Sequence, residues 1–328
     1  MLSVSPLLAV VGPTGSGKSA LALFLAQVFD AEILNCDSLQ VYRYFDIGTA
    51  KASREELRIV PHHLIDAVDP DQVYTAGEFA RDARRIAVEI ASRGRIPIVV
   101  GGTGFYLHAM LDGLSPSPAR DEALRQRLQA REQQRPGSLH RLLRRLDPAA
   151  GQRIHPNDTN KTIRALELRI LARRPAAELF EERGTPPLEG FEPVLLGLDP
   201  PRQALYDVLN ARCEHMFAAG LKEEVRDLLT RFGPHCKPFE AIGYKETVQL
   251  LQETVTFSEA LEQMQRQTRH YAKRQWTWFK RDTRVSWIPG FGHLPETQQI
   301  ALETIRNKSP RSQNFLRSSR NKSTPATY

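Results

Sequence analysis

A glycine-rich segment near the amino terminus constrains the fold of this chain more than any other feature. It reads Gly12-Pro13-Thr14-Gly15-Ser16-Gly17-Lys18-Ser19 and fits the phosphate-binding pattern G-x-x-x-x-G-K-[ST]. The apolar run 7–11 before it predicts a buried strand, and residues 20–28 after it predict a helix. Between a strand and a helix, such a loop turns its backbone N–H groups inward as a nest for anions. We therefore expect a diphosphate or polyphosphate to bind there, with Lys18 adding charge and Ser19 ligating Mg²⁺.

The segments that follow predict a parallel α/β sheet. Residues 32–36, Glu-Ile-Leu-Asn-Cys, and the apolar run 97–100 have strand length, and 75–92 between them have helical spacing. Strands that alternate with helices are typical of parallel sheets, which bind ligands beyond the carboxyl ends of their strands. We expect the loops that follow three of the strands to meet there. These are the loops at residues 12–19, 37–40 and 101–104.

The composition changes after Gly113 and predicts a domain inserted into this sheet. From about residue 121 to 180 every pattern is helical and rich in arginine, and an apolar run at 194–198 then restores a strand. We expect a core at 1–114 plus 192–290, a helical insertion at 115–191, and a basic disordered tail at 305–328. The expected fold class is thus α/β, a parallel sheet like that of P-loop NTPases with an all-helical insertion.

Positive charge is concentrated in two segments. Residues 141–174 hold nine Arg or Lys against three acidic residues, and 304–328 hold six Arg or Lys and no acid. Since the whole chain has a net charge of only +7, the remainder is net negative. Such confined basic segments indicate a polyanionic partner, most simply a nucleic acid, although each could also be an ordinary solvated face.

The cysteines and the apolar runs bear on where the protein works. Cys36, Cys213 and Cys236 show no C-x-x-C spacing, so they predict neither a zinc site nor a disulfide framework. The longest apolar runs have the length of strands and fall far short of a membrane span. No basic segment precedes the first apolar residues, as a signal peptide would require. We expect a cytoplasmic monomer without a membrane partner.

Seven motifs follow one another between residues 7 and 288. They are the loop 12–19, Asp37-Ser38-Leu39-Gln40-Val41-Tyr42-Arg43, Asp46-Ile47-Gly48-Thr49-Ala50-Lys51, Gly101-Gly102-Thr103-Gly104-Phe105-Tyr106, His155-Pro156-Asn157-Asp158 with Arg164-Ala165-Leu166-Glu167, Ile242-Gly243-Tyr244-Lys245-Glu246, and the segment from Tyr271-Ala272-Lys273-Arg274-Gln275 to Phe279. This series resembles that of the tRNA dimethylallyltransferases, also called tRNA isopentenyltransferases. The resemblance implies transfer of a dimethylallyl group from dimethylallyl diphosphate to the exocyclic amine of the adenine 3′ of the tRNA anticodon.

The chemistry of that reaction agrees with the residues at the predicted sheet edge. Diphosphate is the leaving group, so Lys18 and Mg²⁺ would stabilise the charge that builds on it, and ATP hydrolysis is unnecessary. Asp37 is our choice for the base that takes the proton of the amine. It could instead ligate Mg²⁺, as in many P-loop enzymes, or serve as a structural N-cap. Thr103 could bond the adenine or the donor, or simply cap a helix.

The resemblance also implies further contacts to both substrates. An arginine at the position of Arg212 helps to hold the diphosphate, and Val208 stands where a second arginine is common. Ser38, Leu39 and Gln40 would line the adenine pocket. The remaining candidates for tRNA binding are Arg125, Lys161, Arg164, Gly243, Tyr244 and Lys245. RNA loops are recognised through phosphates and splayed bases, and the reactive adenine must leave its stack. Trp276, Trp278 and Phe279 could stack on bases, although core packing is the commoner role of helical aromatic residues.

Three other functions would use the same loop. An adenylate isopentenyltransferase would prenylate AMP or ADP, but a mononucleotide needs no long basic insertion. A small-molecule kinase would turn over ATP and ignore prenyl diphosphates. A non-catalytic RNA-binding protein would bind tRNA and form no product. The motif series favours the tRNA prenyltransferase over all three.

Overall fold

The structure is a computed structural model that describes residues 4–115, 118, 120–175, 178 and 184–309. The chain divides into two compact units, one formed by Met1–Leu111 with Leu188–Tyr328 and the other by Asp112–Pro187. We describe each unit by itself. The first contains the sheet, and the second contains helices.

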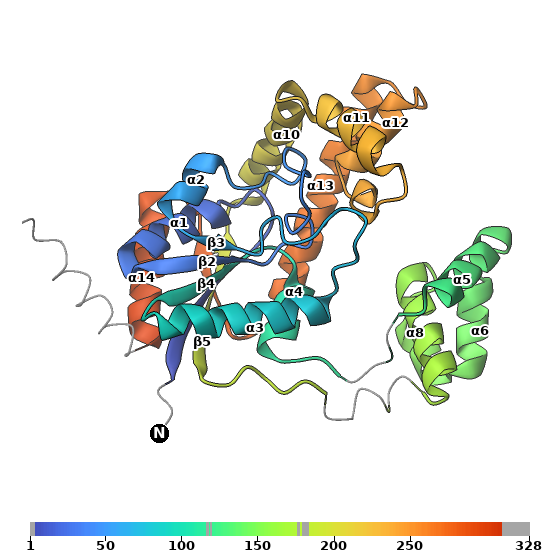
Figure 1. The fold of residues 1–328 in the computed structure, drawn as a ribbon, viewed down its shortest axis with the longest axis horizontal. Helices are drawn as coiled ribbons and strands as arrows, with labels where there is room; N and C mark the ends of the chain where they lie inside the picture. Colours follow the sequence, from blue (N-terminus) through green and yellow to red (C-terminus); the bar gives the residue numbers. More distant parts are fainter. Residues whose placement is uncertain (1–3, 116–117, 119, 176–177, 179–183, 310–328) are drawn as a thin grey trace, which may run out of the picture. The chain divides into compact units, whose positions relative to one another are not determined.

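A six-stranded sheet in the order β3-β2-β4-β1-β5-β6 forms the centre of the first unit (Figure 1). All neighbouring strands in it are parallel, so the predicted sheet class is confirmed. The strands are β1 Ser5–Val11, β2 Ala31–Asn35, β3 His62–His63, β4 Ile96–Val100, β5 Phe191–Asp199 and β6 Val285–Pro289. The order places β1, which leads into the phosphate-binding loop, between β4 and β5 at the centre of the sheet.

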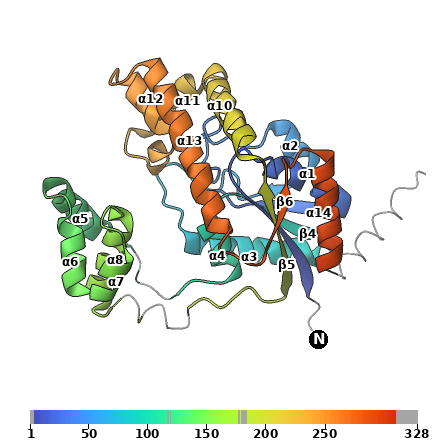
Figure 2. The ribbon, with the colours of Figure 1, turned by 180° about the vertical axis from the view of Figure 1, so that it is seen from behind.

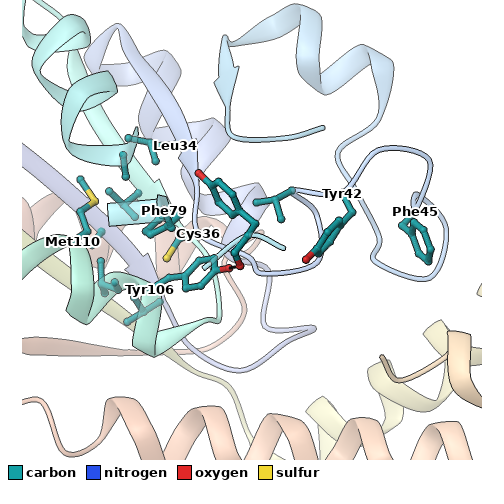
Figure 3. Packing of buried hydrophobic residues seen from close by; sticks show 14 of the residues in the cluster. Leu34, Cys36, Tyr42, Phe45, Phe79, Tyr106 and Met110 are labelled. Atoms are coloured by element: carbon teal, nitrogen blue, oxygen red, sulfur yellow. Dashed lines mark hydrogen bonds between the residues drawn. The ribbon is translucent and has the colours of Figure 1, made fainter. Parts of the chain in front are cut away.

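Helices cover both faces of this sheet (Figure 2). The side chains of β1 alternate between two cores, because Leu7 and Ala9 face one cluster while Leu8 and Val10 face the other. The first cluster, part of which Figure 3 shows, includes residues of α3 Ala76–Ser92, α4 Gly104–Leu111 and α13 Phe257–Phe279. The second includes residues of α1 Lys18–Phe29 and α14 Pro295–Lys308. A strand buried on both faces explains why β1 is apolar throughout rather than alternating.

The carboxyl-terminal part of the sequence adds helices around this core. They are α10 Arg202–Ala218, α11 Leu221–Phe232, the 3₁₀ helix Lys237–Glu240 and α12 Tyr244–Leu251, while α2 Arg54–Ile59 follows β2. None of the helices in the described ranges has the length and apolar character needed to cross a bilayer.

Helix α14 was not predicted, and it corrects the predicted start of the tail. Residues 305–308, which we expected to be disordered, form the last turn of this helix, and Ile305 is fully buried against the second cluster. The rest of the predicted tail, residues 310–328, lies outside the described residues. The segment misled the prediction because the helix depends on Ala301, Leu302 and Ile305, which pack into the second cluster, while Ile300 is exposed.

The second unit is a group of four helices around its own small core. These are α5 Glu122–Gln134, α6 Ser138–Leu146, α7 Pro148–Arg153 and α8 Thr159–Ala172, and no strand occurs among the described residues of this unit. The apolar core includes Leu128, Leu143 and Leu166. Beside it the carboxylate of Glu167, which is fully buried, accepts hydrogen bonds from Arg125 at 3.2 Å and Arg164 at 2.6 Å.

Candidate active site

A cavity of about 370 Å³ lies beyond the carboxyl ends of β1, β2 and β4. The phosphate-binding loop, the segment after β2 and the loop after β4 all contribute to its wall, together with α10. The residues that line it include Thr14, Gly15, Gly17, Lys18, Ser19, Asn35, Asp37, Gln40, Gly101, Gly102, Val208 and Arg212. The three loops therefore meet as the sequence predicted.

The phosphate-binding loop closes on itself through backbone contacts. Ser16 donates its N–H to the carbonyl of Pro13 at 3.3 Å, and the Lys18 ammonium donates to the same carbonyl at 2.7 Å. Gly17 has a φ of +85°, which a residue with a side chain rarely adopts, and it caps the amino terminus of α1. The free N–H groups of the first turn of α1 and its positive dipole end consequently face the cavity, as an anion site requires.

Lys18 is the cation at the centre of this loop. Burial, opposed by the Asp37 carboxylate and aided by the Arg212 guanidinium, lowers the pKa of its ammonium to about 7. An ammonium in this position gains a partner when an anion enters the loop. The charge state of Lys18 and the occupancy of the loop are therefore coupled.

Arg212 reaches the same loop from α10. Its Nη1 donates to the hydroxyl of Thr14 at 3.3 Å, and burial lowers the pKa of its guanidinium. Val208, one helical turn earlier, also lines the cavity and is 42% exposed. The loop thus has two close cations, Lys18 and Arg212. Val208 stands where an arginine, common in the family, would have been a third cation.

Asp37 follows β2 and shares the cavity wall with Lys18. Its Oδ1 accepts the backbone N–H groups of Leu39 at 2.8 Å and Gln40 at 3.4 Å, which fixes the carboxylate in a tight turn. Its other oxygen, Oδ2, has no hydrogen bond to the described part of the chain, and the carboxylate lines the cavity. One oxygen therefore orients the group, and the other can accept a proton or a ligand.

Thr103 connects the segment after β2 with the segment after β4. Its hydroxyl accepts the N–H of Ser38 at 3.1 Å, and its own N–H donates to the carbonyl of Cys36 at 3.3 Å. Its carbonyl also accepts from the first turn of α4. Thr103 thus combines a helix-capping role with a position beside the segment of Asp37, and its bond to the adenine or the donor stays a prediction.

Two residues of α13 complete the site, and neither was among the predicted site residues. The side chain of Gln275, which is 5% exposed, accepts the N–H of Thr14 at 2.7 Å and donates to the carbonyl of Gly102 at 3.0 Å. Tyr271, one turn earlier, places its hydroxyl against Thr103 and Gln275, and burial together with the Asp37 charge raises its pKa. The helix thereby joins the phosphate-binding loop to the loop after β4. Gln275 belongs to the motif 271–279, so the sequence analysis pointed to this segment but assigned no function to Gln275.

The other predicted residues after β2 take different positions. Gln40 lines the cavity, and its amide donates to the carbonyls of Thr49 at 3.1 Å and Ala50 at 3.2 Å. Ser38 contacts Thr103 through its backbone, whereas the N–H of Leu39 is used by Asp37. The carboxamide of Gln40 therefore positions the loop 49–50 at the rim of the cavity.

We predicted that residues 243–245 face RNA, and the burial of Gly243 and Tyr244 contradicts this for two of the three residues. Tyr244 is fully buried, and its hydroxyl donates to Glu224 at 2.6 Å and accepts the N–H of Gly48 at 3.2 Å. Gly243 is also buried, at the amino terminus of α12, and only Lys245 of the three is exposed. The motif holds the loop 46–48 in place, because the tyrosine ring packs on Phe45 and its hydroxyl caps the loop.

The predicted RNA contacts in the second unit differ in exposure. Arg125 and Arg164 both bind Glu167, and the side chain of Arg125 is only 14% exposed, so its role is to neutralise a buried carboxylate. The predicted RNA contact of Arg125 stays a prediction, although most of its side chain is used by this ion pair. The side chain of Lys161 is 73% exposed and pairs with Asp158 at 2.6 Å, so it remains a candidate RNA contact.

The donor set at the cavity fits Mg²⁺ held mainly by substrate. No group of three acidic, histidine or cysteine side chains in the described residues could enclose a metal. Mg²⁺ usually keeps several waters and binds one or two protein oxygens together with substrate phosphates. The Ser19 hydroxyl and the Asp37 carboxylate, which both line the cavity, are oxygens of that kind.

Comparisons with known proteins identify the family. The model of the family described as IPP transferase matches residues 40–282, about three quarters of the chain. The chain belongs to this family. It is 54% identical over 301 residues to the tRNA dimethylallyltransferase of Solibacter usitatus, a match that covers 92% of this chain and 98% of the relative. It is 51% identical over 303 residues to that of Koribacter versatilis, with the same coverage of both chains.

Solved structures of the IPP transferase family share the fold. The tRNA isopentenylpyrophosphate transferase of Bacillus halodurans is 36% identical with a TM-score of 0.68, and the match covers 94% of this chain and 99% of that one. A eukaryotic dimethylallyltransferase acting on tRNA is 27% identical with a TM-score of 0.73, over 94% of this chain and 77% of that one. The predicted resemblance and the predicted fold class are confirmed.

Proposed function

We propose that this protein transfers a dimethylallyl group from dimethylallyl diphosphate to the exocyclic amine of the adenine 3′ of the anticodon in tRNA, and releases diphosphate. The observation that carries the proposal is the cavity itself, where an anion nest with two cations faces a carboxylate that keeps one oxygen available. Family membership supports the same reaction class, because relatives of nearly equal length are named tRNA dimethylallyltransferase.

The phosphate-binding loop holds the leaving group in this mechanism. The N–H groups at the start of α1, the Lys18 ammonium and the Arg212 guanidinium all surround the space where the diphosphate would lie. As the bond between the allylic carbon and the diphosphate oxygen breaks, the electron pair stays on that oxygen, and these fixed charges stabilise it. Bound Mg²⁺, which the Ser19 hydroxyl would help to hold, would supply further positive charge.

Asp37 acts on the acceptor. Its Oδ1 is fixed by the N–H groups of Leu39 and Gln40, so Oδ2 points a defined lone pair toward the incoming amine. When the amine nitrogen bonds to the allylic carbon, Oδ2 takes the amine proton. Thr103 and Tyr271 support this geometry, because the hydroxyl of Thr103 holds Ser38 beside Asp37 and Tyr271 packs against Thr103.

Mass analysis of digested tRNA tests the proposal. The protein is incubated with unmodified tRNA, Mg²⁺ and dimethylallyl diphosphate, and the nucleosides are then separated and weighed. We expect one adenosine per tRNA to gain a five-carbon unit. Parallel incubations with AMP as acceptor, or with ATP in place of the prenyl donor, should give no product. Prenylated AMP without prenylated tRNA would instead make the protein an adenylate isopentenyltransferase.

A further inference from the structure

Two large aromatic side chains are exposed next to the candidate active site. Phe105 is 50% exposed and follows Thr103 by two residues at the start of α4, and Trp278 of α13 is 46% exposed. Their ring centroids lie 6.5 Å apart with an interplanar angle of 85°. We call these two residues the aromatic pair. Both belong to the first unit and both lie on segments that carry site residues.

The fold does not need Trp278 as a core residue. The adjacent Phe279 is 3% exposed and belongs to the main apolar cluster, so it already anchors the end of α13. Trp278 instead packs one edge on the backbone of Gly104, where a side chain on residue 104 would overlap the indole ring. An exposed ring held in this way has little freedom to lose when another flat group stacks on it. The structure thus presents a large apolar surface that is already oriented.

The surroundings of the aromatic pair are basic. Arg274 lies four residues before Trp278 on α13, so the two share one face of the helix. Arg281 follows Trp278 by three residues, just beyond the end of the helix. Both arginines are exposed, and neither pairs with an acidic side chain in the described part of the chain. Tyr271 continues this face toward the cavity, with the Arg274 guanidinium 5.7 Å from the centre of its ring. Tyr271, Arg274 and Trp278 therefore form a stripe along α13 that starts beside Thr103.

Single-stranded nucleic acid is the partner that fits this surface. Unpaired bases stack on aromatic rings, while arginines between the rings hold the phosphates. A protein partner would match the apolar rings equally well but gives no reason for two arginines without acidic partners near the rings in sequence. A base that enters the cavity must leave its stack, which exposes the faces of its neighbours in the strand. A platform two residues from Thr103 is placed to cover such a face.

We propose that the aromatic pair of Phe105 and Trp278 is a stacking platform for a nucleotide that directly flanks the reactive adenine. This inference rests on the proposed function. It assigns to α13 a part in RNA recognition in addition to its contacts with the phosphate-binding loop. The platform acts on RNA binding and leaves donor binding alone, because neither ring lines the cavity.

Binding measurements on matched variants test the platform. Trp278→Leu and Phe105→Leu remove one ring each, Trp278→Phe keeps a ring, and Phe257→Leu is the control because it removes an equally exposed ring at the other end of α13. Loss of one stacked base weakens binding about 5-fold to 150-fold. We expect that loss for an unmodified anticodon stem-loop RNA in both leucine variants at the platform. Trp278→Phe should stay within about threefold of wild type, and Phe257→Leu and all donor affinities should be unchanged.

An abasic RNA identifies the stacked nucleotide. The stem-loop is prepared with the base removed on either side of the reactive adenine, and each RNA is measured with wild type and with Trp278→Leu. For the nucleotide on the platform, removing both the base and the ring should weaken RNA binding no more than removing either one alone. Additive losses at both positions would overturn the proposal, as would unchanged RNA affinity in both leucine variants. Equal losses of RNA and donor affinity would also overturn it, by showing that the rings only maintain the fold.

The same experiments separate this inference from the proposed function. If wild type forms no prenylated adenosine from tRNA, the proposed function fails and the platform loses its basis. If wild type forms the product and the leucine variants bind RNA normally, the function stands and the platform alone is refuted.

Discussion

The pKa of Lys18 predicts how donor binding depends on pH. An ordinary lysine has a pKa of 10.5 and is charged throughout the physiological range, whereas burial lowers the pKa of Lys18 to about 7. Its charged form binds an anionic diphosphate, and its neutral form does not offer that charge. Donor affinity should therefore be highest at or below about pH 7 and should fall as the pH rises through that value.

The size of the effect follows from the same shift. About one tenth of Lys18 is charged at pH 8 and about one hundredth at pH 9, so binding of the donor must draw a proton onto the ammonium. If the bound diphosphate restores the pKa to its ordinary value of 10.5, the dissociation constant rises about tenfold per pH unit between about pH 7 and 10. Phosphate groups complete their own second ionisation at about pH 6, so they contribute little to this slope.

Calorimetry without tRNA measures this coupling directly. Dimethylallyl diphosphate and Mg²⁺ are titrated into the protein between pH 6.5 and 9.5 in buffers of different ionisation heat, which gives both the affinity and the number of protons taken up. We expect nearly one proton per donor at pH 8.5. Lys18→Arg, which stays charged, and Lys18→Met, which has no charge, should both remove the slope. A flat wild-type profile above pH 7, or a slope that persists in Lys18→Met, would refute the role of Lys18.

Three further substitutions test other parts of the structure. Asp37→Asn should lower kcat by about 10²-fold to 10⁴-fold in single-turnover assays and leave tRNA affinity within threefold; an equal loss of both would exclude a role as base. Gly102→Ala should displace Gln275 and lower kcat/KM for the donor, and unchanged kinetics would show that the bridge to the phosphate-binding loop is dispensable. Glu167→Ala leaves two arginines without their buried partner, at a cost of about 3–5 kcal/mol. Limited proteolysis should then cut faster within residues 112–187, while donor affinity stays normal.

Patterns of local sequence predicted those parts of the fold that local sequence determines. The run Leu7–Val11 is apolar because both faces of β1 are buried, and Thr75 begins α3 with a capping box that includes Glu78. Residues 300–308 carry too few apolar groups to reveal α14 by composition. The helix forms because Ala301, Leu302 and Ile305 pack into the second apolar cluster, which is tertiary information.

The same distinction separates the site residues that were predicted from those that were not. Asp37, Thr103 and Lys18 follow strand ends in the sequence, so parallel topology alone brings them together. Tyr244 looked like a surface residue of a polar motif, yet its hydroxyl finds Glu224 and Gly48, which are distant in sequence. Its burial depends on those partners, and no local pattern encodes them.

The glycines after β4 show what the motif 101–104 encodes. They look like residues of a flexible turn, but the absence of a side chain at each one lets a different residue pack against its backbone. A side chain on Gly101 would overlap the carbonyl of Cys36, one on Gly102 would overlap the amide of Gln275, and one on Gly104 would overlap the ring of Trp278. The first contact brings the segment that carries Asp37 against the segment that carries Thr103.

The other two contacts set the position of α13. Gln275 holds α13 against the loop after β4, and Trp278, three residues later on the same face of the helix, then meets Gly104. Gln275 then reaches the N–H of Thr14, so the same register that presents Trp278 outward also holds the phosphate-binding loop. A shift of α13 by one residue would turn both side chains away at once. The proposed RNA platform therefore depends on the packing of Gln275 that also holds the donor site, whereas the donor site does not need the Trp278 ring.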